Sequence, residues 1–206
     1  MIFCLFFITD YLFGYTQVSS SWFFLFASLA VSAYGYSLIE FIWIGGSFKS
    51  WWNDQRMWMI KGVTSYLFGL IEVAGKLIGV SEVGFEVTNK VVDSEAAKRY
   101  EEEIFEFGVA SGLFIPPATL AVINLISLMG GLVRILREGY SAFECMILQL
   151  VLCTFIVITS YPILEAMLMR KDTGRIPASV TIFSISVAVS VCSVASMTIP
   201  AWSREL

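Results

Sequence analysis

Histidine is absent from this chain of 206 residues. Without it the sequence has no Ser-His-Asp triad, no Cys-His dyad and no HExxH zinc site. Charged residues are scarce too, at 15%, where an ordinary soluble domain has about a quarter. The net charge of −4 comes without any basic block, so nucleic acid is not an expected partner.

Other chemical motifs are missing as well. The four cysteines lie in apolar runs with no CxxC spacing, which is typical of small buried hydrophobic residues (Cys4, Cys145, Cys153 and Cys192). There is no DxD triplet for a metal and no glycine-rich phosphate loop; Gly130-Gly131 is expected to end an apolar helix. The sequence therefore predicts no catalytic or metal-binding set of its own.

Apolar residues dominate what is present, at 57%, with a mean hydropathy of +0.78. A membrane-spanning helix needs about twenty mostly apolar residues. Residues 22–44 meet this requirement, and residues 112–198 hold three more such segments (Gly112–Leu132, Phe143–Leu164 and Ala178–Thr198). Residues 1–21 are interpreted as the remnant of a preceding membrane segment and its loop, and residues 199–206 as a tail. The expected fold is an all-α membrane protein with about four transmembrane helices.

The distribution of Lys and Arg predicts the orientation. Seven lie between Gly45 and Ser111 (Lys49, Arg56, Lys61, Lys76, Lys90, Lys98 and Arg99), and three lie in the short segment from Glu165 to Pro177 (Arg170, Lys171 and Arg175). Only Arg134, Arg137 and Arg204 fall on the other side. The positive-inside rule therefore places residues 45–111 in the cytosol.

Residues 45–80 have helical spacing of apolar side chains and are rich in tryptophan. Because tryptophan favours the headgroup region, we expect one or two amphipathic helices lying in the membrane surface. An alternative makes Val63–Val80 a fifth span, but this segment is short and carries Glu72 and Lys76.

Residues 81–111 differ in character. The stretch GFEVTNKVVD is β-branched and alternating, and SEAAKRYEEEIFEF is highly charged. A capping-box-like Ser94 predicts that a short helix starts there, and the acidic run from Glu101 to Glu103 is typical of a solvated helix face. We expect a cytosolic loop tied at both ends to the membrane.

Four motifs in one order resemble a known family. They are GGSFKSWWNDQRMWMIKGVTSYLFG, GFEVTNKVVD, LFIPPATLAVINLISLMGG and YPILEAMLMRKDTGRIP. Together they resemble the C-terminal membrane region of plant cellulose synthases and cellulose synthase-like proteins, which are family 2 glycosyltransferases. WWNDQRMW with AAKRYEEEIFEFG is most similar to the E/G-type branch.

The resemblance implies a role for the polar loop. In the family, FxVTxK marks a gating loop that covers the active site when a nucleotide-sugar is bound, and Phe85, Val87, Thr88 and Lys90 match this pattern. A lysine charge and a threonine hydroxyl both suit a diphosphate. The resemblance further implies that the intact enzyme is a hexosyltransferase of the cellulose synthase (UDP-forming) type, using a UDP-sugar with Mg²⁺ or Mn²⁺.

The sequence departs from the family in two respects. QxxRW is absent, and there is no room for the sugar-transfer domain that the family places before these helices. We therefore expect a fragment that binds no cofactor and has no transferase activity alone. The expected location is the Golgi, the endoplasmic reticulum or the plasma membrane, as a multi-pass protein.

Several functions stay open. The leading hypothesis is the channel and gating part of an enzyme making β-glucan or a related cell-wall polysaccharide, with the bilayer, a UDP-sugar, glucan and other synthase subunits as partners. Alternatives are an enzyme acting on a small lipophilic acceptor such as a triterpenoid, and a non-catalytic module associating with full-length synthases. A small transporter is disfavoured because the sequence shows no inverted repeat.

Overall fold

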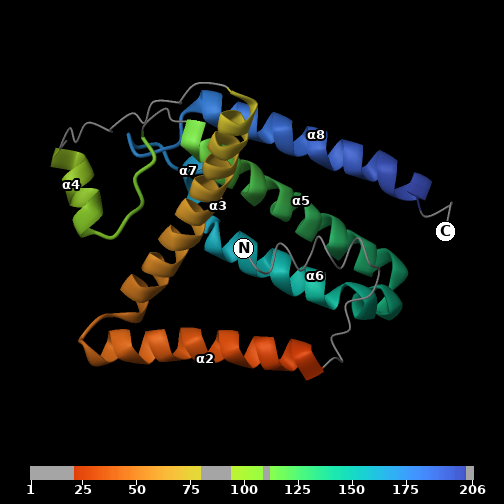
Figure 1. Cartoon of the computed structure of the whole chain (residues 1–206), viewed down its shortest axis with the longest axis horizontal. Coiled ribbons are helices and arrows are strands. Elements are labelled where there is room, and N and C mark those ends of the chain that lie inside the picture. The colour runs from red at the N-terminus through yellow and green to blue at the C-terminus, as the bar shows by residue number, and fades with distance from the viewer. Residues whose placement is uncertain (1–20, 80–93, 109–111, 203–206) are drawn as a thin grey trace. The chain divides into compact units, whose positions relative to one another are not determined.

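The computed structural model describes residues 21–79, 94–108 and 112–202 (Figure 1). These ranges are almost wholly helical and contain no strand, which confirms the all-α expectation. The helices in chain order are α2 (Ser21–Trp43), α3 (Phe48–Ile78), α4 (Ser94–Glu101), the 3₁₀ turn η1 (Gly112–Phe114), α5 (Ile115–Glu138), α6 (Tyr140–Thr159), α7 (Tyr161–Leu168) and α8 (Ala178–Trp202).

The chain divides into two compact units, residues 1–62 and 63–206, and the division falls inside α3. In the first unit Trp51 is the buried contact between α3 and α2, with 7% of its surface exposed. Its indole nitrogen donates to the Ser37 hydroxyl oxygen at 3.1 Å. Gly46 permits the tight turn between these helices, since a Cβ there would lie 2.2 Å from the Phe41 ring.

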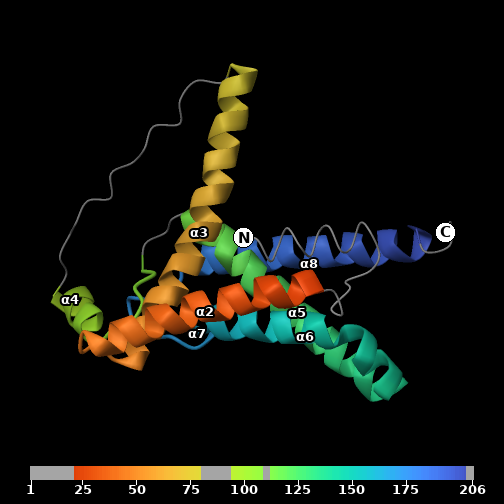
Figure 2. The same cartoon turned by 60° about the horizontal axis from the view of Figure 1, so that its bottom comes forward.

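The second unit is organised around α5, which packs against α6, α7 and α8 (Figure 2). Small side chains fill these contacts: Ala118, Ala121 and Ala188 are wholly buried. Without a hydrophobic driving force between helices in lipid, such small residues let backbones approach and gain van der Waals contact. The α5–α6 pair is joined through the single residue Gly139, which has a positive φ of 76°.

Prolines lie in the first turns of two of these helices, where the missing N–H has no intrahelical partner to lose. Pro162 opens α7, and the axis bends by 60° between residues 149–159 and 161–168, so the predicted span from Phe143 to Leu164 is a bent pair of helices. Pro117 lies in the first turn of α5 and has no N–H for the Leu113 carbonyl. The Thr64 hydroxyl on α3 donates to that carbonyl instead, at 3.2 Å.

Within the described residues, two helices are long and apolar enough to cross a membrane, residues 112–138 and 178–196. A third span is present if the bent pair of α6 and α7 counts as one. The predicted span at residues 22–44 does form a helix, α2, but α2 is not among these candidate spans. A total of about four transmembrane helices therefore stays a prediction.

Two local expectations change. The Gly130-Gly131 pair does not end its helix, because α5 continues to Glu138. Gly131 is instead a packing residue: a Cβ there would lie 2.9 Å from a Leu150 methyl on α6, while Gly130 faces open space. The amphipathic segment from residue 48 is a single helix of 31 residues, and the open choice between one helix and two is thereby resolved.

The two glycines provide a matched test of the α5–α6 contact. Gly131→Leu should lower stability by about 1–3 kcal/mol, because the new side chain has to displace Leu150 and separate the helices. Gly130→Leu adds the same atoms at an exposed position, where no neighbour lies within 4 Å of the added Cβ, and should be close to neutral. Thermal unfolding of both variants in detergent measures the difference. Equal melting temperatures would contradict the packing role of Gly131.

Candidate functional site

The predicted gating residues Phe85, Val87, Thr88 and Lys90 lie outside the described residues. Their role therefore stays a prediction. The structure does describe both flanks of the segment that contains them. On one side α3 ends at Ile78 and is followed by Gly79, which has a positive φ of 81°. On the other side lie α4 and residues 102–108, and these make specific contacts.

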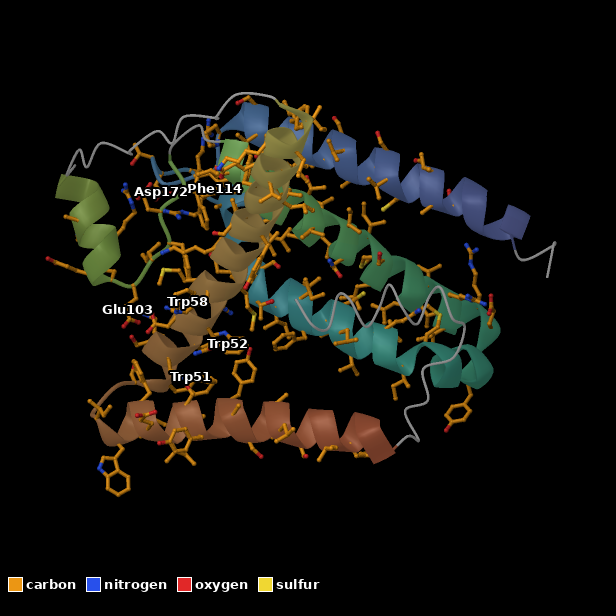
Figure 3. The ribbon with its side chains drawn as sticks, viewed as in Figure 1. Trp51, Trp52, Trp58, Glu103, Phe114 and Asp172 are labelled. Carbon is orange, nitrogen blue, oxygen red and sulfur yellow. The ribbon has the colours of Figure 1, made fainter. Side chains whose placement is uncertain are left out.

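The short helix predicted to start at Ser94 is confirmed as α4. It ends in a turn in which the Ile104 N–H donates to the Arg99 carbonyl at 2.8 Å, and Glu103 adopts a left-handed conformation with φ of 58°. This pattern is a Schellman motif with glutamate where glycine is usual. Glu101, Glu102 and Glu103 are exposed, in agreement with a solvated acidic run. The turn redirects the chain toward the loop between α7 and α8 (Figure 3).

Four charged residues join residues 99–108 to the α7–α8 loop, and we call them the anchor cluster: Arg99, Glu106, Arg170 and Asp172. Arg99 Nε lies 2.6 Å from Glu106 Oε2 and 3.9 Å from Asp172 Oδ2. Arg170 Nε donates to Asp172 Oδ1 at 2.9 Å, and its Nη2 reaches the other carboxylate oxygen. This two-pronged geometry is the strong form of an arginine–carboxylate pair.

Arg170 also reaches across to the other segment. Its Nη1 donates to the Phe105 carbonyl oxygen at 2.6 Å. The backbone adds a second link, because the Phe107 N–H donates to the Gly174 carbonyl at 3.2 Å. Both arginine side chains are largely covered, with 13% of Arg99 and 12% of Arg170 exposed. Both guanidinium groups therefore bond other groups of the protein and are largely shielded from solvent.

Two glycines allow this close approach. A Cβ on Gly108 would lie 2.2 Å from the Thr173 carbonyl oxygen, and one on Gly174 would lie 2.3 Å from Arg170 Nη2. The Gly108 N–H in addition donates to Glu106 Oε1 at 3.1 Å. The contact between the two segments thus depends on the absence of side chains at both positions.

An aromatic contact lies under the anchor cluster. Phe107 is 4% exposed and stacks on Phe105, with ring centroids 6.1 Å apart. It also meets the edge of Phe114, which precedes α5, at 5.4 Å. The segment after α4 is thereby fixed to the start of a predicted membrane span.

Electrostatics favour the ionised cluster. The hydrogen bond from Arg170 holds the pKa of Asp172 below its usual range, with the charges of Arg170 and Arg99 acting in the same direction. Among the residues that the structure describes, no group of three or more Cys, Asp or Glu side chains is placed to hold a metal ion. The cluster is suited to holding residues 102–108 in position against the α7–α8 loop.

Sequence reasoning missed this cluster. From the sequence, Arg170 is interpreted as part of an orientation signal and a lipid headgroup contact, and Glu106 as part of an exposed acidic stretch. The available signal was the pair of mixed-charge segments KRYEEEIFE and RKDTGR, both predicted to be cytosolic. Opposite charges on two cytosolic segments favour contact, but the sequence does not specify which residues pair.

A helical membrane protein with a polar segment anchored to its span-bearing helices is the class that these features define. The sequence model of the family described as Cellulose synthase matches residues 2–205. The chain therefore belongs to the cellulose synthase family, and the resemblance inferred from its motifs is confirmed. No solved structure matches it.

Curated relatives agree with this assignment. The chain is 44% identical to "Cellulose synthase-like protein E1" of Oryza sativa subsp. japonica, over 83% of this chain and 23% of the relative. It is 41% identical to "Cellulose synthase-like protein E2" of the same plant, over 86% and 24%. It is 37% identical to "Quillaic acid 3-O-glycosyltransferase CSL1" of Saponaria officinalis, over 78% and 23%. The chain thus spans about a quarter of the length of these relatives.

Arg170→Gln should release residues 102–108 from the α7–α8 loop. The substitution removes the fork on Asp172 and weakens the bond to the Phe105 carbonyl. Charge-assisted hydrogen bonds contribute about 1.5–3 kcal/mol, so amide hydrogen exchange at residues 104–108 should rise about ten- to a hundredfold.

Arg134→Gln is the matched control. It also removes an arginine–glutamate pair, with Glu138 at 2.9 Å, but this pair is exposed and lies on one helix. Such a pair contributes about 0.3–0.5 kcal/mol, so exchange at 104–108 should not change. Equal exchange in Arg170→Gln and the unmodified chain would show that Arg170 does not anchor the segment.

The anchor should weaken in acid. Because the pKa of Asp172 is lowered in the folded protein, its stabilisation is present above the ordinary aspartate value of about 3.9 and is lost as pH falls through the lowered pKa. Amide exchange at 104–108, corrected for its intrinsic pH dependence, should therefore rise at acidic pH. Asp172→Asn should lack this component at every pH. A wild-type profile identical to that of the variant would exclude Asp172 as its source.

Proposed function

We propose that this chain is the C-terminal membrane and gating part of a cellulose synthase-like glycosyltransferase that uses a UDP-sugar donor. Membership of the cellulose synthase family supports the class of enzyme. A relative 31% identical over 173 residues is described as a UDP-forming cellulose synthase catalytic subunit, which supports the donor. The chain covers only about a quarter of its curated relatives, so the transferase activity belongs to the longer protein in this proposal.

The observation that carries the proposal is the fixed flank of the FEVTNK segment. A lid over an active site needs ends that hold their position while its middle moves. The anchor cluster provides such an end after α4, through Arg170 and the Phe105 carbonyl. The other end follows α3, where Gly79 closes the helix with a bond from its N–H to the Lys76 carbonyl at 3.2 Å.

In the proposed mechanism the segment covers the donor. The Lys90 ammonium and the Thr88 hydroxyl meet the diphosphate, while Phe85 and Val87 hold the inserted loop against the enzyme. Closure excludes water from a reactive sugar donor and so limits hydrolysis. In the intact enzyme Mg²⁺ or Mn²⁺ would neutralise the diphosphate charge. The described residues offer no metal-binding group, so the proposal gives them no part in holding that ion.

The product in the leading form of the proposal is a β-glucan or related cell-wall polysaccharide that leaves through the helix bundle. A small lipophilic acceptor is the second candidate. It is favoured by the relative described as a quillaic acid 3-O-glycosyltransferase, which is 37% identical over 162 residues. A non-catalytic module that associates with full-length synthases is the third. We place residues 45–111 in the cytosol, on a Golgi, endoplasmic reticulum or plasma membrane.

Lys90→Ala in the full-length protein tests the lid. Loss of one charge-assisted contact to the diphosphate should raise the KM for the UDP-sugar, or lower kcat/KM, by about tenfold or more. Lys76→Ala is the matched control, because Lys76 is half exposed and paired with Glu72 on its own helix at 2.8 Å. UDP release with UDP-glucose is the measurement. Unchanged donor kinetics in Lys90→Ala would exclude the diphosphate contact, and UDP release by the 206-residue chain alone would contradict its dependence on a longer protein.

A further inference from the structure

The loop between α7 and α8 carries three basic residues, and the structure separates them by role. Arg170 turns inward to Asp172 and the Phe105 carbonyl. Lys171 and Arg175 are exposed, and neither side chain has an ion pair or hydrogen bond with any residue that the structure describes. Two cations on this short loop are therefore available to a partner outside the protein.

Two large apolar side chains immediately precede these two cations in the chain. Leu168 ends α7 with 65% of its surface exposed, and Met169 follows with 66% exposed. The opposite side of α7 is buried in the bundle through Ile163 and Ala166, which are 2% and 1% exposed. The exposed side of this region thus combines two apolar side chains with two positive charges.

The loop holds this combination in a fixed arrangement. The Ile176 N–H donates to the Ala166 carbonyl at 3.0 Å, and the Arg175 N–H donates to the Asp172 carbonyl at 3.2 Å. The anchor cluster adds the fork between Arg170 and Asp172. Because the backbone around Lys171 and Arg175 is already ordered, binding through them requires little further loss of backbone freedom.

Position limits the choice of partner. The loop connects the bent pair of α6 and α7 to α8, and each of these is a candidate span. If both spans cross the bilayer, the loop lies at its surface, where apolar side chains reach the acyl boundary and long basic side chains extend to the headgroups. A free polyanion would satisfy the two charges but would leave Leu168 and Met169 exposed to water.

We propose that Leu168, Met169, Lys171 and Arg175 form a binding surface for anionic phospholipid, with the two bases on the headgroup phosphate and the two apolar residues at the acyl boundary. Each basic residue near an anionic surface strengthens binding about fivefold. The pair should therefore favour an anionic over a zwitterionic lipid by about thirtyfold at most. This surface is independent of the lid proposed for residues 81–93.

The test compares spin-labelled phosphatidylglycerol with spin-labelled phosphatidylcholine bound to the full 206-residue chain in bilayers. The relative association constant for phosphatidylglycerol should fall at least fivefold in Lys171→Gln/Arg175→Gln and should fall in the unmodified chain at high salt. The matched control is Arg134→Gln/Arg137→Gln. It removes two bases near the C-terminal end of α5, away from the α7–α8 loop in the sequence. This control variant should lose less of the preference for phosphatidylglycerol over phosphatidylcholine than Lys171→Gln/Arg175→Gln does.

Each outcome decides the proposal. A preference unchanged in Lys171→Gln/Arg175→Gln overturns it, as does an equal or greater loss in the control pair. Competition by millimolar inorganic phosphate would assign the cations to a soluble anion and would also overturn the lipid surface. If the double variant loses its fold, its amide exchange at 104–108 will rise, and the single variants Lys171→Gln and Arg175→Gln, each with an expected loss of up to about fivefold, then decide the question.

Discussion

The two-pronged bond of Arg170 to Asp172, together with its bond to the Phe105 carbonyl, is the interaction on which the arrangement of the polar segments depends. A guanidinium that is only 12% exposed is destabilising unless its N–H groups are satisfied. Here one side chain satisfies that need with Asp172 on its own loop and with the Phe105 carbonyl, 65 residues away in sequence. This bond brings the two segments close together, and Gly108, Gly174 and the buried Phe107 fit that close approach.

Long apolar runs predicted α5 and α8 from the sequence, because length and hydropathy are local properties. Proline chemistry is local too, since Pro117 and Pro162 lie in the first turns of α5 and α7 and the chain bends before α7. The anchor cluster was not predictable in the same way. The sequence gives the charges of Arg170 and Glu106, but it does not show which distant atom each side chain contacts. Gly131 was misjudged for a related reason: only the neighbouring helix shows that its missing side chain is a packing feature.

The packing of α5 connects the membrane unit to the polar segment. Small residues bring α5 close to α6 and α8, and the aromatic contact of Phe107 with Phe114 joins the start of α5 to residues 105–107. The α7–α8 loop meets the same residues from the other side. A displacement of these helices would therefore move the flank of residues 81–93 with them, whereas a flexible tether would absorb it.

One short loop thus has two separate electrostatic roles. Positive-inside bias alone would treat Arg170, Lys171 and Arg175 as equivalent, because orientation depends on their number. Geometry makes them unequal: Arg170 bonds Asp172 and the Phe105 carbonyl, whereas Lys171 and Arg175 are exposed on the same loop, close in sequence to the exposed Leu168 and Met169. An arginine suits the inward role, since its planar fork can bond a carboxylate and a carbonyl at once, while a lysine at that position would provide only a point charge. The inward residue should therefore tolerate Arg-to-Lys exchange poorly, and the outward residues, which need charge alone, should tolerate exchange between Lys and Arg.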